Sequence, residues 1–166
     1  MSNAREELLV KSWMSHDARW FNAVAKEFGL EAANRVNQVA ARDAGKVEGQ
    51  RARRDLGVGP VTSGAACVQA LDELVRTFGG PNLLAYQAEA DGEARATIRV
   101  QRCFAHENVT RAGIADRYDC GIFARVEGWL EGLGCVASVT PALKGCLKAK
   151  GSPCVHRITI HGDRAG

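Results

Sequence analysis

The spacing of the apolar residues changes at Gly79-Gly80-Pro81, and this change restricts the fold more than any other feature of the sequence. Before it, apolar residues recur every three or four positions. This is typical of amphipathic helices and predicts helices over 4–28 and 31–55 and a third ending at Phe78. After it, residues 83–90 and 93–103 read as strands. They flank Asp91-Gly92, a strong signal for a hairpin with a two-residue turn.

The rest of the chain adds two helices and three short strands to this pattern. We expect helices over 107–115 and from about Tyr118 to Leu133, followed by strands over 135–140, 143–149 and 154–160. The last two strands would form a hairpin through Lys150-Gly151-Ser152. This order predicts an α+β fold with the N-terminal helices packed on an antiparallel sheet. Gly45 and Gly49 weaken the second helix and indicate either a close helix crossing or a bend.

The 166 residues are enough for one domain with a real core, so we expect a single domain with a helical half (1–80) and a second half (81–166). The sequence has no stretch of 18 uninterrupted apolar residues, so it predicts no membrane-spanning helix. Charges near the N-terminus argue against a secretory signal and favour the cytoplasm. A net charge of +3 without a concentrated basic face predicts no nucleic-acid partner. The glycine-rich segments match no nucleotide-binding loop, and no serine-hydrolase motif is present.

Six cysteines make the composition unusual. In a reducing compartment, spaced cysteines bind metal more often than they form disulfides. Cys120 opens the last long helix, whose dipole would stabilise its thiolate, and Cys146 and Cys154 flank a turn. Zinc requires three or four such ligands at tetrahedral positions. The alternative is that these cysteines are small buried packing residues. A thiol-based redox function is a third interpretation, but the sequence has no CxxC pair to support it.

The stretch 117–158 resembles the 4-vinyl reductase domain, a ligand-binding domain of phenol-sensing bacterial activators and bacteriochlorophyll biosynthesis proteins. The matching positions are Cys120, Gly128-Trp129, Gly132, Cys146, Gly151, Cys154 and Arg157-Ile158. The resemblance implies a structural zinc on Cys120, Cys146 and Cys154. It also implies an apolar, aromatic or tetrapyrrole-like small-molecule ligand and a homodimer. The N-terminal half, with its run from Trp13 to Asp17, is similar to small uncharacterised bacterial cytosolic proteins, some of whose relatives are described as hydrolases of amino-thiazoline carboxylic acid.

One position departs from the resembled family. A glutamate ligand commonly stands three residues before the second cysteine, and here that residue is Leu143. Cys103 and His106 are the best candidates for the fourth ligand, and Cys135 and His156 are weaker ones. If none of these binds, the fourth position is open to water or substrate. The alternative function is then a zinc-dependent hydrolase that uses a metal-bound water.

Trp13, His16 and Trp20 share one face of the first helix, with Asp17 beside them. In one interpretation these four residues line an apolar ligand pocket that has one polar group. His16 would then donate a hydrogen bond or act as a general base. In the other, the tryptophans belong to the core and His16 lies at its edge.

Overall fold

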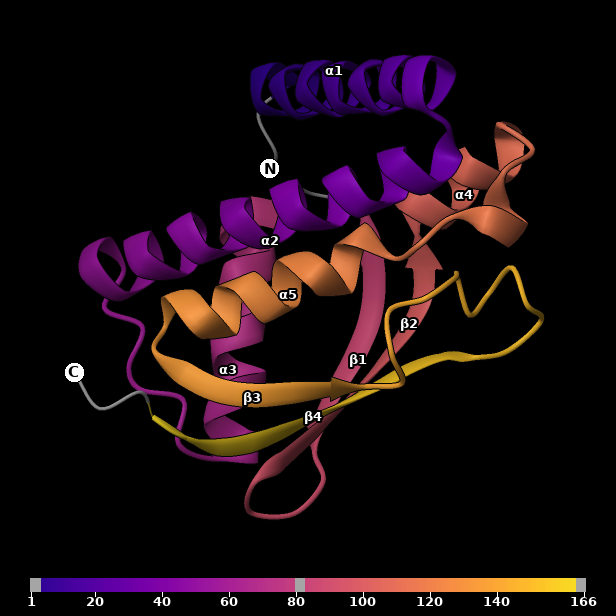
Figure 1. The fold of residues 1–166 in the computed structure, drawn as a ribbon. Coiled ribbons are helices and arrows are strands. Elements are labelled where there is room, and N and C mark those ends of the chain that lie inside the picture. Colours follow the sequence, from indigo (N-terminus) through magenta and orange to yellow (C-terminus); the bar gives the residue numbers. More distant parts are fainter. Residues whose placement is uncertain (1–3, 80–82, 164–166) are drawn as a thin grey trace.

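The computed structural model describes residues 4–79 and 83–163 and shows the predicted α+β fold (Figure 1). Its helices are α1 (Ala4–Phe28), α2 (Leu30–Asp55), α3 (Gly64–Leu74), α4 (Phe104–Arg111) and α5 (Gly121–Gly132), with a π turn at Val75–Gly79 and a 3₁₀ turn at Ala115–Arg117. Its strands are β1 (Leu84–Ala90), β2 (Arg95–Cys103), β3 (Cys135–Thr140) and β4 (Cys154–Asp163). No helix in these two ranges is long and apolar enough to cross a bilayer.

The four strands form one antiparallel sheet in the order β1-β2-β4-β3. Helices α3 and α5 pack on one face of this sheet, α2 packs on α5, and α1 lies farthest from the sheet (Figure 1). The core fills the space between the sheet and these helices. Its members include Leu74, Ile98, Phe123, Trp129, Leu130 and Ile158. A smaller apolar cluster around Phe21 and Tyr118 lies under the C-terminal part of α1.

Helices α2 and α5 cross in direct backbone contact. A Cβ atom added to Gly45 or Gly49 would collide with the backbone of α5, and one added to Gly128 or Gly132 would collide with the backbone of α2. The interpretation of Gly45 and Gly49 as a close helix crossing is therefore confirmed. The crossing matters for the site because α5 begins directly after Cys120.

Three predictions about the strands were wrong. Residues 143–149 form no strand. The backbone N–H groups of Lys150, Gly151 and Ser152 donate to carbonyls of residues 146–148, so this segment folds into turns instead of a ladder. The last strand, β4, pairs with β2 and β3, so the predicted hairpin between 143–149 and 154–160 does not form. The β1–β2 connection also spans residues 91–94 and not two residues, although Gly92 has the expected positive φ of 93°.

Candidate functional site

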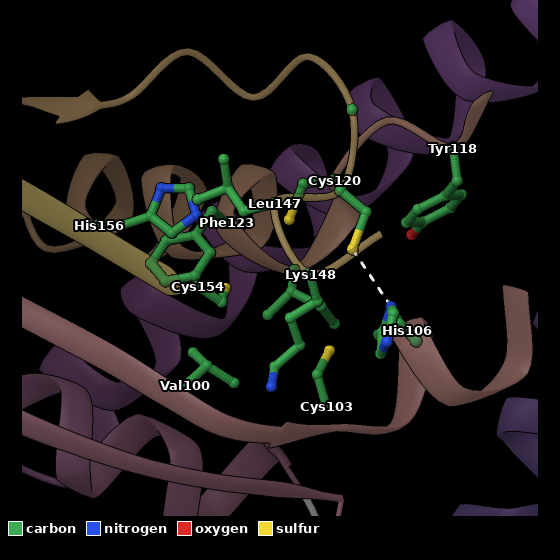
Figure 2. Close-up of a pocket in the computed structure, with 14 residues that line it drawn as sticks. Val100, Cys103, His106, Tyr118, Cys120, Phe123, Leu147, Lys148, Cys154 and His156 are labelled. Carbon is green, nitrogen blue, oxygen red and sulfur yellow. Dashed lines mark hydrogen bonds between the residues drawn. The ribbon is translucent and has the colours of Figure 1, made fainter. Parts of the chain in front are cut away.

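Four of the six cysteines lie around one small cavity of about 30 Å³. Cys103 comes from the end of β2, Cys154 from the start of β4, Cys120 from the residue before α5 and Cys146 from the loop between β3 and β4. Figure 2 shows Cys103, Cys154 and Lys148 reaching the same space from different segments. Other residues that line the cavity include His106, Tyr118, Phe123, Leu147 and His156.

The sheet register brings the first two cysteines together. Val100 of β2 pairs with Cys154 of β4. Because the two strands are antiparallel, the last residues of β2 lie beside the first residues of β4 at one end of the strands. Cys103 lies three residues beyond Val100 and forms the N-cap of α4. The cavity therefore lies where the sheet ends and α4 begins.

Hydrogen bonds from α2 and the segment before α5 hold the other two cysteines. The Gln38 side chain donates to the carbonyl oxygens of Cys120 (3.2 Å) and Leu143 (2.8 Å), and the backbone N–H of Cys120 donates to the Leu143 carbonyl (3.3 Å). The backbone N–H of Gly145 donates to Asp119 Oδ1 at 2.7 Å. These bonds fix the loop that carries Cys146 beside Cys120. Leu143, at the glutamate position of the resembled family, packs its side chain against the core.

Burial favours the protonated form of three cavity thiols, those of Cys103, Cys120 and Cys154. It raises the pKa of Cys120 to about 12 and that of Cys154 to about 11. Burial also raises the pKa of Cys103, and the backbone N–H groups of His106 and Ala105 act in the opposite direction. The Lys148 ammonium group lowers the thiol pKa of both Cys103 and Cys154, so the cavity holds a cation suited to thiolates.

The two histidines of the cavity have different environments. The Nδ1 atom of His106 lies 3.5 Å from the Cys146 sulfur, the contact drawn as a dashed line in Figure 2. His156 is 2% exposed and stacks on Phe123 with 3.7 Å between ring centroids. Its Nδ1 has no hydrogen-bond partner among the described residues, and burial lowers its pKa to about 4.

The structure brings together all five predicted metal ligands, since Cys103, His106, Cys120, Cys146 and Cys154 line this one cavity. Within residues 4–79 and 83–163, however, no group of three His, Cys, Asp or Glu side chains is arranged to hold a metal ion. The other two cysteines lie elsewhere, because Cys67 and Cys135 are buried in the core. The sequence reasoning missed Lys148 and Gln38, and neither residue has a spacing or composition that would have identified it.

A larger groove lies between α1 and the helices α4 and α5. One part has a volume of about 200 Å³ and a second, under the N-terminal half of α1, about 370 Å³. Both parts are lined by Trp13, Met14, Phe104, Ile122 and Arg125. The groove also adjoins the cysteine cavity, because Ala105, Tyr118 and Ile122 line both.

The predicted ligand-binding residues divide between two sides of α1. Trp13 and Asp17 line the groove, whereas His16 and Trp20 are exposed and do not line it. The interpretation of the tryptophans as core residues was wrong, because Trp13 is 64% and Trp20 44% exposed. Helix α1 stands away from the sheet, and Phe21 is its only buried residue in the described range.

The polar groups of the groove are an ion-paired arginine, the Asp17 carboxylate and several amides. Arg125 donates through Nε to Glu48 Oε2 at 2.8 Å, and the same oxygen accepts from Trp129 Nε1 at 2.7 Å. Amide side chains of Asn22, Asn37 and Asn108 add neutral donors and acceptors. An apolar wall with a few polar groups is typical of small-molecule sites.

Comparison with known proteins adds one finding. The model of a family of unknown function, DUF6125, matches residues 5–129, which include Cys103, His106 and Cys120. No curated protein and no solved structure shows a significant match.

Proposed function

The chain belongs to DUF6125, a family of unknown function, and we propose that it is a cytoplasmic small-molecule-binding protein with a structural zinc site. The zinc ligands would be Cys103, Cys120, Cys146 and Cys154, and the ligand groove would lie under α1. The observation that carries this proposal is the convergence of four cysteines from four separate segments on a cavity of about 30 Å³.

The chemistry of this cavity fits zinc. Four thiolates are a common structural zinc set, with Zn–S distances near 2.3 Å. A zinc ion bound by four thiolates carries a net negative charge, which the Lys148 ammonium would partly balance. The cysteine side chains would have to change rotamer to close on the ion, each moving from one staggered position to another. Zinc there would join β2, β4, the 141–153 loop and the start of α5.

The groove supports the ligand part of the proposal. Its apolar lining, aromatic side chain of Trp13 and neutral amides suit an apolar or aromatic molecule, including a tetrapyrrole-like one. Glu48 compensates the charge of Arg125, and Asp17 adds a carboxylate, so the residues that line the groove offer no free positive charge to an anionic ligand. The likeness of residues 117–158 to the 4-vinyl reductase domain points to the same ligand class.

Cysteine variants test the zinc proposal. We expect Cys120→Ser, Cys146→Ser and Cys154→Ser each to lower both zinc content and melting temperature, because structural zinc contributes folding free energy directly. Cys135→Ser is the matched control, since Cys135 lies away from the cavity, and it should keep its zinc. Zinc content comes from elemental analysis and melting temperature from circular dichroism. Full zinc in all three cavity variants would reject the site.

A zinc-dependent hydrolase is the second candidate, and it is favoured by the shared wall of cavity and groove at Ala105, Tyr118 and Ile122. If Cys103 does not bind, the fourth position would be open to a metal-bound water facing a groove ligand. X-ray absorption distinguishes the two, because four sulfur ligands near 2.3 Å support the structural site. Three sulfurs and one oxygen near 2.0 Å would favour the hydrolase.

The ligand groove has its own test. We expect Trp13→Ala to reduce the amount of organic molecule that co-purifies with the protein in native mass spectrometry, because Trp13 lines both parts of the groove. Leu8→Ala is the matched control, because Leu8 is an exposed apolar residue of the same helix that does not line the groove. Equal retention in both variants would place the ligand elsewhere.

A further inference from the structure

Helix α1 carries two apolar rows on adjacent sides. The inner row faces the body of the protein and contains the buried or half-buried Val10, Met14, Phe21 and Val24. The outer row is Leu9, Trp13, His16 and Trp20, whose spacings of four, three and four residues are those of alternating a and d positions in a coiled coil. Leu9 is 70% and Trp13 64% exposed, and 70% of the His16 side chain is exposed.

We propose that this outer row binds a second copy of the chain, with the two α1 helices antiparallel. An antiparallel pair centred between Met14 and Ser15 places Leu9 opposite the partner's Trp20 and Trp13 opposite the partner's His16. Each layer then combines an a position with a d position, as antiparallel coiled coils require. The row is therefore complementary to itself, which a two-fold interface demands.

The exposed area is large enough for such an interface. Fully buried aromatic side chains remove about 150–250 Å² each from water. If the partner covered all of their exposed area, the four side chains of the row would bury about 500 Å² per copy, or about 1,000 Å² in all, which is the lower limit for a specific interface. The helix also carries as many basic as acidic residues, so two copies would not repel each other through net charge.

This pairing would also complete the ligand groove. Trp13 lines the groove on one side and lies exposed on the other, so the partner helix would cover its outer side and fix its position. The inference does not depend on zinc, and its test leaves the cysteine cavity unchanged.

Two leucine variants of the full chain test the interface. Light scattering after size exclusion should give twice the chain mass for the wild-type protein and for Leu8→Glu, and the single chain mass for Leu9→Glu. Leu8 is the matched control because it is 65% exposed on the same helix but outside the row. Trp20→Glu should repeat the Leu9→Glu result. A monomeric wild-type protein, or equal behaviour of the Leu8 and Leu9 variants, would overturn the proposal.

Cysteine cross-linking tests the antiparallel direction. Under mild oxidation, Leu9→Cys chains mixed with Trp20→Cys chains should form a mixed disulfide-linked dimer, while Leu9→Cys chains alone should not link to each other. Wild-type chains are the control for the native cysteines. Cross-linking of Leu9→Cys chains alone would show parallel pairing and contradict the proposed interface.

Discussion

The environment of each cysteine determines which chemistry is open to it. Burial raises the pKa of Cys67 to about 12, with a smaller contribution from nearby Cys135. Burial also raises the pKa of Cys103 and of Cys154, but the positive charge of Lys148 lowers both pKa values. A thiol that must become a thiolate benefits from such a cation, whereas a packing thiol does not. The core pair and the cavity cysteines are therefore suited to different functions.

Lys148 should tune zinc affinity. We expect Lys148→Gln to weaken zinc binding by about tenfold, because groups just outside the ligand shell commonly contribute 10–100-fold. Lys150→Gln is the control, since the Lys150 ammonium donates to the Lys144 carbonyl at 3.0 Å and does not line the cavity. Competition with a chromophoric chelator measures both affinities. Equal affinities in the two variants would contradict a role for the Lys148 charge.

At the scale of single residues, the sequence predicted which cysteines lie together, but it did not predict the residues that surround them. Spacing and the resemblance pointed to Cys120, Cys146 and Cys154, and the end of a predicted strand pointed to Cys103. Lys148 could not be predicted, because it lies in a segment that reads locally as a strand and folds as turns. The outward positions of His16 and Trp20 also escaped prediction, since helical spacing shows which residues share a face but not what that face meets.

At the scale of elements, the α2–α5 crossing joins the helical half of the chain to the site. Gln38 of α2 holds the carbonyls of Cys120 and Leu143, and this depends on how closely α2 approaches α5. The four glycines of the crossing set that distance. Helix periodicity predicted both helices, and the glycines indicated either a close approach or a bend. Their partner could not be predicted, because it comes from about 80 residues further along the chain.

A glycine variant tests the crossing. We expect Gly128→Ala to destabilise the protein by about 3 kcal/mol or more, because its Cβ would collide with the Arg42 carbonyl and force the helices apart. The gain in helix propensity, about 1 kcal/mol, is too small to compensate. Gly59→Ala is the control, since its Cβ meets no heavy atom within 4 Å among the described residues. Urea unfolding measures both, and equal stabilities would contradict the packing described.

At the scale of the whole molecule, the cavity and the groove adjoin each other under α1. The sheet and α5 supply a rigid base, while α1 contacts the body mainly near its C-terminal end and forms the groove's outer wall. The α+β class followed from the order of helical and strand periods. The arrangement of layers did not, because it depends on contacts between distant segments such as β2 with β4. The proposed zinc would secure the segments at one end of the sheet, and the proposed ligand would fill the groove beside it.

Native mass spectrometry tests the central claim most directly. The protein is purified without chelators and its native mass is compared with its denatured mass. We predict one zinc ion per chain, together with an apolar organic molecule retained in the groove. Protein that carries no zinc, and takes up none when supplied with an equal amount under reducing conditions, would contradict the account and leave the four cavity cysteines as packing residues.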